Sequence, residues 1–225
     1  SYLQFPDQIL SHMVLGSSLG VIVFSSLSST FSHNLRGAVD WGLIKLVAPS
    51  IVVGSAIGGI TAGALDSDTL QGLVALFLVV ASIQLIFEFP PPPQNPKTNL
   101  IGPVLAGGGI GWLSGVFGIG GGIFSVPYFY HRGLLMMKAI GTSAACGIPI
   151  ALAGSLSYMI IGYENINLPE NSIGYVYLPA TIIVGLVSSL TAKYGVTIAH
   201  RMKQKKLRIG FAFLVMLMAL NLLMR

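Results

Sequence analysis

The chain has very little charge for its length. Charged residues make up 8% of its 225 residues and hydrophobic residues 53%, and its mean hydropathy is +0.80. A soluble domain carries about 25% charged residues, so this sequence lacks the charge needed to cover a water-facing surface. The deficit excludes an ordinary soluble protein. It predicts an all-α fold, in the form of a polytopic helical membrane protein.

Residues that bind metals or perform catalysis are also scarce. The single cysteine, Cys146, excludes an intramolecular disulfide and any multi-cysteine metal site. The four histidines form no HExxH pair, and no GxxxxGK[ST] loop is present for ATP. An intramembrane hydrolase is an alternative, but Ser114-Gly115 and Gly154-Ser155 are too short to be a nucleophile motif. We therefore expect no enzyme activity, no catalytic residue, no metal site and no cofactor.

The excess of basic residues is concentrated in one place. The formal net charge is +5, and six of the twelve Lys and Arg residues lie between Lys193 and Arg208. Such a cluster is typical of a cytoplasmic loop that obeys the positive-inside rule, so the charge does not indicate nucleic-acid binding. No signal peptide is expected, because Asp7 precedes the first apolar run and no basic n-region is present.

Uncharged runs predict the membrane-spanning segments. A helix needs about 20 apolar residues to cross the hydrocarbon core of a bilayer, and most of the runs approach that length. They cover residues 8–35, 46–65, 69–87, 98–131, 139–163, 171–192 and 209–224. We therefore expect an integral protein of the cell membrane (plasma or inner membrane), with the lipid bilayer as a partner.

One of these runs contains a glycine-rich break. Four glycines fall within Gly118–Gly122, and Pro127 follows. Each glycine costs a helix about 1 kcal/mol relative to alanine, and proline removes a backbone donor. The pattern predicts a helix that breaks at membrane depth, where irregular backbone must be buried in protein or line a cavity. Gly107, Gly111 and Gly115 precede the break and predict a face for close helix packing.

The proline-rich stretch at 90–99 predicts a division of the chain into two halves. Pro90 to Pro93 and Pro96 give an extended, semi-rigid connector. The first half is then 1–89 and the second half 100–225.

The two halves resemble each other. Leu15-Gly16-Ser17-Ser18 matches Ile140-Gly141-Thr142-Ser143 at an offset of 125 residues, and Gly37 matches Gly162 at the same offset. The first-half equivalent of the glycine-rich break would precede Gly16 and falls before residue 1.

Loop charges predict that the repeat is inverted. Arg36 and Lys45 follow the first run, whereas the equivalent loop at 163–172 has no Lys or Arg. The turn at 66–68 has only aspartates as charged residues, whereas its equivalent at 193–208 is basic. Equivalent loops on opposite sides of the membrane are the mark of an inverted repeat. Such a repeat requires an odd number of crossings between equivalent loops, so one segment must re-enter, and the glycine-broken segment is the natural candidate.

These motifs resemble a known family, the TauE/SafE sulfite exporters. The second-half signature is Gly118-Ile119-Gly120-Gly121-Gly122 with Pro127, followed by Ala139-Ile140-Gly141-Thr142-Ser143. The first half is similar to the family at Leu15 to Leu19, Ser28-Ser29, His33 and Gly37 to Trp41. The resemblance covers essentially the whole chain. It implies a secondary transporter, often an exporter, of small sulfur-containing anions such as sulfite, sulfonates and related organosulfur acids.

The repeat and the break together predict a site for such an anion near the midplane. A broken helix offers unpaired backbone N–H groups, glycine admits a ligand close to them, and serine or threonine adds hydroxyl donors. No Lys or Arg lies near the middle of a run, so neutral donors are expected to bind the anion. The expected substrate-binding residues are Gly16, Ser17, Ser18, Gly120, Gly121, Gly122, Gly141, Thr142 and Ser143.

Three alternatives remain open at this point. The serine and threonine hydroxyls can instead bond back to their own helix. The protein can be a channel, or a carrier for an unrelated small anion such as a carboxylate. A second copy of the chain is the other candidate partner, which would give a homodimer.

Overall fold

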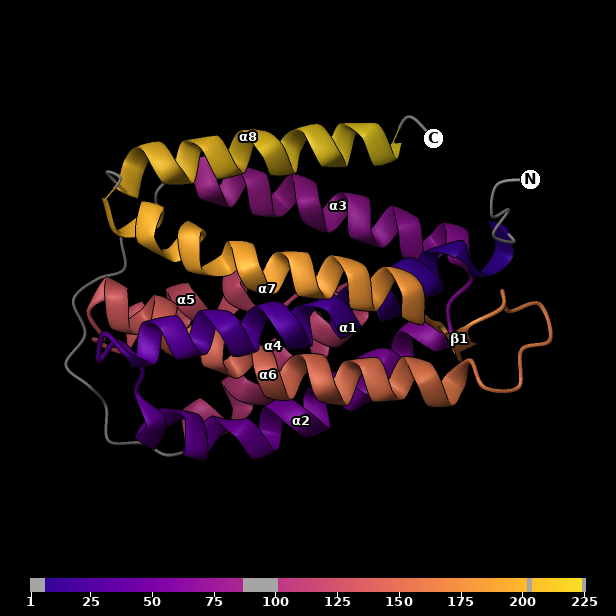
Figure 1. Cartoon of the computed structure of the whole chain (residues 1–225), viewed down its shortest axis with the longest axis horizontal. Helices are drawn as coiled ribbons and strands as arrows, with labels where there is room; N and C mark the ends of the chain where they lie inside the picture. The colour runs from indigo at the N-terminus through magenta and orange to yellow at the C-terminus, as the bar shows by residue number, and fades with distance from the viewer. Residues whose placement is uncertain (1–6, 87–100, 202–203, 224–225) are drawn as a thin grey trace.

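The computed structural model describes residues 7–86, 101–201 and 204–223, and almost all of them are helical (Figure 1). The elements in chain order are α1 (Asp7–Asn34), α2 (Trp41–Gly63), α3 (Ser67–Ile86), α4 (Ile101–Phe117), α5 (Gly122–His131), α6 (Met136–Ile161), β1 (Ser172–Ile173), β2 (Val176–Tyr177), α7 (Leu178–Arg201) and α8 (Gln204–Leu223). Among the described helices, α1, α2, α6 and α7 are long and apolar enough to cross a membrane. The all-α prediction is confirmed.

Acidic residues cap the N-termini of two helices. The carboxylate of Asp40 accepts a hydrogen bond from the amide of Leu43 over 3.0 Å and caps α2. Asp66 precedes α3 and accepts from both the amide and the hydroxyl of Thr69, each over 2.8 Å. These bonds favour the ionised carboxyl and lower the pKa of Asp66 from its ordinary value.

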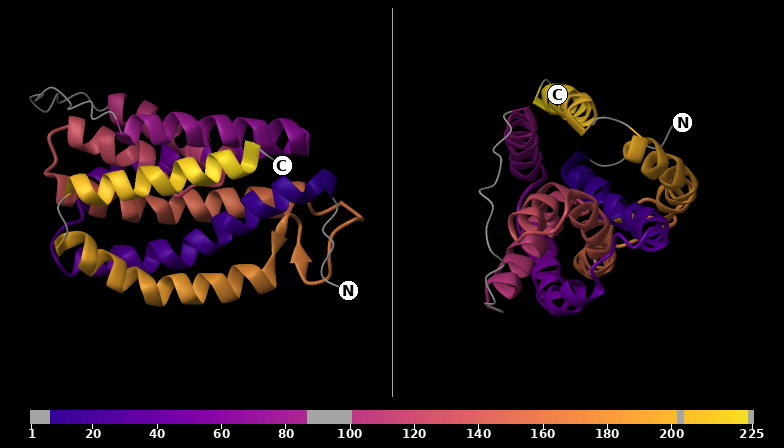
Figure 2. Two further views of the ribbon diagram at one scale, coloured as in Figure 1. Left: turned by 90° about the horizontal axis from the view of Figure 1, so that it is seen from above. Right: turned by 90° about the vertical axis from the view of Figure 1, so that its left-hand side faces the viewer.

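The helices lie side by side along the long axis of the molecule (Figure 1). The packed pairs include α1 with α6 and α7, α2 with α4 and α6, and α3 with α8. In the end-on view, α3 and α8 lie to one side of the other helices (Figure 2). The hairpin of β1 and β2 pairs Ser172 with Tyr177 and closes the connection between α6 and α7.

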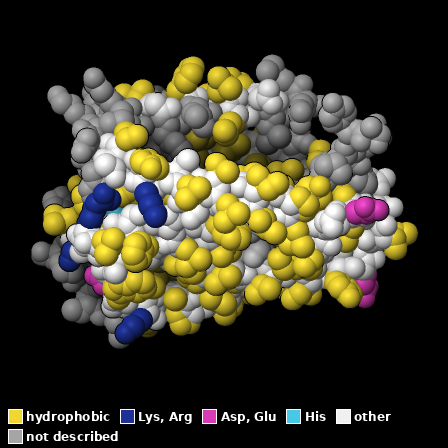
Figure 3. All heavy atoms as spheres, in the orientation of Figure 1, with side chains coloured by type: hydrophobic (Ala, Val, Ile, Leu, Met, Phe, Trp, Pro, Cys, Tyr) yellow, Lys and Arg dark blue, Asp and Glu magenta, His cyan; other side chains and the backbone are white. Residues whose placement is uncertain are grey.

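The two ends of the bundle differ in charge. We name the end with turns 35–40 and 132–135 the basic end, and the end with turns 64–66 and 162–177 the hairpin end. On the face in Figure 3, the Lys and Arg side chains gather at the basic end, where acidic atoms are also visible. Acidic side chains also lie at the hairpin end, and hydrophobic side chains cover the surface between the two ends. This distribution suits a protein embedded in a bilayer.

The α2–α4 contact relies on glycine. A methyl group at Gly111 would meet the carbonyl oxygen of Ile51, and one at Gly115 would meet that of Ser55. At Gly107 it would lie 2.5 Å from the Ser50 hydroxyl oxygen. The predicted packing role of these three glycines is therefore confirmed, because each lets the two backbones approach closely.

Two predicted boundaries are wrong. The segment predicted to begin at 171 starts with the β-hairpin, and its helix begins only at Leu178. Absence of charge does not distinguish a short strand pair from a helix. The predicted loop at 193–208 is largely helical, because α7 continues to Arg201 and α8 begins at Gln204. Lys and Arg are strong helix formers. The predicted connector at 90–99 lies outside the described residues.

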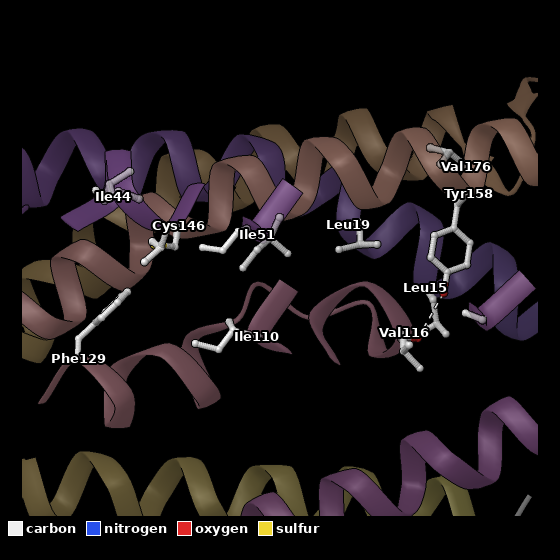
Figure 4. Close-up of a cluster of buried hydrophobic side chains, with 14 of the residues drawn as sticks. Leu15, Leu19, Ile44, Ile51, Ile110, Val116, Phe129, Cys146, Tyr158 and Val176 are labelled. Carbon is white, nitrogen blue, oxygen red and sulfur yellow. Dashed lines mark hydrogen bonds between the residues drawn. The ribbon is translucent and has the colours of Figure 1, made fainter. Parts of the chain in front are cut away.

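A cluster of buried apolar side chains joins α1, α2, α4, α5 and α6 (Figure 4). Leu19, Ile51 and Ile150 are buried at its centre, and Phe129 joins it from α5. Near the hairpin end, the hydroxyl of Tyr158 donates to the carbonyl of Val116 over 3.3 Å. This cluster holds the end of α4 against α6 and thereby positions the break described next.

Candidate functional site

The predicted helix break is present between α4 and α5. Helix α4 ends at Phe117 and α5 begins at Gly122. Gly118 and Gly121 have φ values of 64° and 75°, which is a left-handed conformation that glycine adopts without steric cost. The Ile119 amide donates to the carbonyl of Ser114 over 3.0 Å and closes α4. The glycines therefore interrupt the helix where their spacing predicted a break.

After the break, α5 returns toward the end at which α4 began. A methyl group at Gly102, near the start of α4, would lie 3.6 Å from Nη1 of Arg132, which follows α5. At Gly121 it would lie 3.2 Å from the Ser114 hydroxyl and 3.6 Å from the Ile110 side chain. Both ends of the α4–α5 hairpin thus lie at the basic end, and its tip points into the bundle.

The tip of this hairpin lies against the middle of α6. A methyl group at Gly147 would lie 3.5 Å from the carbonyl oxygen of Gly120. A methyl group added at Gly121 would meet the side chain of Ile150, and one added at Gly122 would lie 3.8 Å from the Ser143 hydroxyl. Because α6 spans 136–161, these neighbours place the break at about half of its length.

Serine hydroxyls from three helices hold the backbone of the break. Ser18 of α1 donates to the carbonyl of Gly118 over 3.0 Å. Ser125 of α5 donates to the carbonyl of Gly121 over 2.9 Å, and its oxygen lies 2.7 Å from that of Ser143 on α6. Sequence reasoning missed Ser125, although its position four residues after Gly121 is a signal for bonding within one helical turn.

The start of α5 offers donors that the protein leaves unused. In the described part of the chain, no acceptor is recorded for the amides of Gly121, Gly122 and Ile123, as expected for the first turn of a helix. Gly122 is exposed. The hydroxyl of Ser114 is fully buried and faces Gly121, and within residues 7–86, 101–201 and 204–223 it has no hydrogen-bond partner. Unpaired amides, a positive helix end and a free hydroxyl at one point can bind a small anion.

Comparison with known proteins identifies the family. The chain matches the family Sulfite exporter TauE/SafE over residues 3–222. It belongs to this family. A probable membrane transporter protein of Haemophilus influenzae is 30% identical over 225 residues, which cover 98% of this chain and 84% of the relative. Another, from Methanocaldococcus jannaschii, is 27% identical over 226 residues, which cover 99% and 82%. No solved structure matches the chain.

Membership of the TauE/SafE family makes this protein an integral membrane transporter and not an enzyme. The long apolar helices agree with that assignment, as does the mostly uncharged surface between the two ends on the face in Figure 3. Its functional site must therefore bind a solute and release it chemically unchanged.

The TauE/SafE fold brings only some of the predicted site residues together. Ser18, Ser143 and Gly120 to Gly122 all lie at the break. Ser17 and Thr142 face away from it, toward two loops. The hydroxyl oxygen of Ser17 accepts from the amide of Tyr177 over 2.9 Å, and that of Thr142 accepts from the amide of Asp40 over 3.0 Å.

Gly16 and Gly141 lie beside these loop contacts. A methyl group at Gly16 would lie 2.7 Å from the carbonyl oxygen of Tyr175, and one at Gly141 would meet that of Ala38. Both glycines thus allow a loop to approach the bundle. Ser114, which sequence reasoning set aside, lies at the break instead. Its signal was its place on the glycine-rich packing face, four residues before Gly118.

Proposed function

We propose that the α4–α5 break is the anion-binding site of a secondary transporter for small sulfur-containing oxyanions, with export as its direction. The observation that supports this most directly is the group of unused donors at Gly121, Gly122, Ile123 and Ser114. The family's description as a sulfite exporter supports the substrate class. Sulfite, sulfonates and related organosulfur acids carry charged oxygens that accept such hydrogen bonds.

Neutral donors suit a substrate that must be released. Removing a charged group from water without compensation costs several kcal/mol, and each hydrogen bond to a charged group returns roughly 1.5–3 kcal/mol. The side chains that approach the glycines of the break are aliphatic or serine residues, such as Ile22, Ile150 and Ser143. Binding by amides and hydroxyls therefore remains weak enough to reverse.

We further infer that the two halves, 1–89 and 100–225, form an inverted repeat around this site. Each helix of the first half runs opposite to its equivalent in the second half: α1 is opposite to α6, α2 to α7 and α3 to α8 (Figure 1). If α1 corresponds to α6 and α2 to α7, the contact of α1 with α7 should recur between α6 and α2. Both pairs are in contact. Under this arrangement the α4–α5 hairpin enters and leaves the membrane on one side, as a re-entrant element.

Matched contacts support the inversion at the level of single atoms. Thr142 stands 125 residues after Ser17, and Tyr177 stands 137 residues after Asp40. The Asp40 amide bonds to Thr142, and the Tyr177 amide bonds to Ser17. One half thus repeats the contact of the other with the partners exchanged.

A second matched pair involves backbone alone. The Ala38 amide donates to the carbonyl of His33 over 3.0 Å, and the Tyr175 amide donates to that of Tyr158 over 3.1 Å. Tyr158 stands 125 residues after His33, and Tyr175 stands 137 after Ala38. The two offsets therefore recur in a contact that involves no side chain.

The loop glycines require a change in the sequence alignment of the halves. Gly37 has φ 64°, whereas Gly162, its predicted match, has φ −81°. Gly174 has φ 52° and stands 137 residues after Gly37. Its conformation makes it the better equivalent, and the offset grows because the loop of the second half is longer.

The inverted repeat explains why both halves contact the break. Ser18 and Ser143 stand 125 residues apart, and they reach the break through Gly118 and Ser125 respectively. A substrate at the start of α5 would therefore lie between equivalent elements of the two halves, which is where inverted-repeat transporters bind their substrates.

A binding screen tests this proposal. Purified protein is titrated with sulfite, a sulfonate, thiosulfate and a carboxylate, and thermal shift is followed for each anion. The proposal expects stabilisation by the sulfur oxyanions and its loss in Gly122→Ala. Equal or stronger stabilisation by the carboxylate would favour the alternative, a carrier or channel for an unrelated anion. Stabilisation that survives Gly122→Ala would place the site elsewhere.

A further inference from the structure

An apolar groove on the outer surface separates part of α2 from α6. Its volume is about 400 Å³. It is lined entirely by apolar and aromatic side chains: Trp41, Ile44, Ala48, Val52, Ala145, Ile148, Pro149, Leu152, Ala153 and Leu156. Toward the hairpin end the two helices close together, where a methyl group at Gly59 would lie 2.7 Å from the Cβ of Ser157. The small side chains at 48, 145 and 153 leave the groove open nearer the basic end.

The length of the groove is similar to the thickness of one leaflet of a bilayer. From Trp41 to Val52 the helix rises about 16 Å at 1.5 Å per residue, roughly half of a 30 Å hydrocarbon core. Trp41 stands at the start of α2, and its indole N–H donates to the Asn34 side chain over 2.8 Å. An aromatic ring in this position is typical of the membrane interface. The groove thus runs from the interface inward.

Two exposed lysines flank the outer end of the groove. Lys45 lies on α2 between the lining residues Trp41 and Ala48, and Lys138 lies on α6 about two turns before Ala145. In the described part of the chain, neither lysine forms an ion pair. Long lysine side chains can extend along apolar surface and place their charge at headgroup level. The nearby carboxylate of Asp40 already caps α2.

We propose that this groove binds one acyl chain of an anionic phospholipid, whose phosphate lies between Lys45 and Lys138. The chemistry is complementary at both ends, because an apolar chain fits the lining and a negative headgroup meets two unpaired cations. A second copy of this chain fits less well. In an isologous contact along this face, the lysines of both copies would meet at the same depth, and like charges would repel.

Tryptophan fluorescence gives a local test. The chain has two tryptophans, so in Trp112→Phe selective excitation of indole reports on Trp41 alone. The protein is reconstituted in phosphatidylcholine vesicles that contain either phosphatidylglycerol or phosphatidylcholine with brominated acyl chains, which quench indole fluorescence on contact. We expect brominated phosphatidylglycerol to quench Trp41 more strongly at equal mole fraction. Lys45→Gln and Lys138→Gln should each reduce that preference about fivefold.

Matched variants separate the groove from the general membrane surface. Ala48→Leu fills the groove and should abolish the preference, whereas Ala192→Leu, a partly buried position on α7 outside the groove, should leave it unchanged. Lys193→Gln serves in the same way as the control for the lysines. A parent protein without preference, or a preference that survives Ala48→Leu, overturns the proposal. Quenching that falls as the protein-to-lipid ratio rises also overturns it, because a second copy would then cover Trp41.

A second measurement avoids substituting Trp112, which packs near α2. Native mass spectrometry of the unmodified chain should show phosphatidylglycerol retained after detergent removal. The double variant Lys45→Gln with Lys138→Gln should lose it. Equal retention in both proteins would overturn the proposal independently of the fluorescence result.

Discussion

The hydroxyl of Ser18 donates a hydrogen bond to the carbonyl of Gly118 across 100 residues of sequence, over 3.0 Å. Gly118 is the left-handed residue that ends α4, so the bond ties the first half of the chain to the break in the second. On the other side of the break, Ser143 contacts Ser125, whose hydroxyl donates to the carbonyl of Gly121. The two serines therefore hold the same short backbone segment from α1 and from α6.

Removing both serines should give coupled effects. Ser18→Ala and Ser143→Ala should each weaken anion binding about fivefold, since a neutral hydrogen bond contributes about 1 kcal/mol. The double variant should lose less than the sum, because both bonds order one segment. Titration of sulfite into each purified protein measures the effects. Ser25→Ala, whose hydroxyl bonds within α1, is the control. Strict additivity would mean that the serines act on separate sites.

Gly122→Ala should impair transport without impairing folding. Gly122 is exposed, and among the described residues outside its own turn an added methyl group would come within 4 Å of the Ser143 hydroxyl alone, at 3.8 Å. The methyl group therefore fits, but it would lie at the first turn of α5, where the anion is proposed to bind. Flux into vesicles should fall at least tenfold, while the unfolding temperature stays unchanged. A tenfold fall corresponds to a rise of about 1.4 kcal/mol in the activation free energy of transport. Gly109→Ala faces open space and should retain full flux.

Gly121→Leu and Gly107→Leu should fail in different ways. At Gly121 (φ 75°) the new side chain would strain the left-handed backbone, displace the flexible end of Ile150 and occupy the break. The strain is confined to one short segment and costs about 1–3 kcal/mol, so the protein should reach the membrane with a lowered unfolding temperature and not transport. At Gly107 it would press on the backbone of Val47 and separate α4 from α2, so little folded protein should accumulate. Membrane fractionation together with flux distinguishes the two. Normal flux in Gly121→Leu would remove the break from the transport pathway.

Ser17→Ala and Thr142→Val should reduce stability by similar amounts. Each removes the acceptor of one partly buried backbone amide, that of Tyr177 in β2 or that of Asp40. The loss should be about 1 kcal/mol, at the low end of the cost of an unpaired buried group. Thermal unfolding in detergent measures the change. Thr191→Ala, at an exposed hydroxyl that bonds within α7, should be neutral. A loss of anion binding at unchanged stability would return Ser17 and Thr142 to the substrate site.

The segment 193–208 should be cytoplasmic, and the loop 163–172 should lie on the opposite side. The positive-inside rule sets this orientation. Single cysteines introduced at Lys193 and Glu164, both exposed, can be labelled with an impermeant reagent on intact cells in a Cys146→Ala background. Only the cysteine at 164 should react. Labelling at 193 alone would reverse the orientation.

Composition and glycine spacing were enough to predict the class of protein and the position of the break. Scarcity of charge leaves no way to cover a soluble surface, so membrane helices follow from composition alone. Clustered glycines and a proline disfavour a continuous helix, so the glycines at 118–122 with Pro127 located the helix break within a few residues. Family motifs spread over the whole chain led to the correct family.

Which side of each motif faces the break depends on how the helices pack, and the motifs themselves do not show it. Neighbouring residues on a helix point in directions about 100° apart, so Ser17 and Ser18 cannot both face one point, and nothing in their spacing tells which does. Because α1 packs against the β-hairpin before α7, the Ser17 hydroxyl contacts the Tyr177 amide. The Ser18 hydroxyl then points toward the break and donates to the Gly118 carbonyl. Ser114 faces Gly121, seven residues later, because the left-handed turn at Gly118 redirects the chain after α4, and residue spacing alone does not give the direction of that turn.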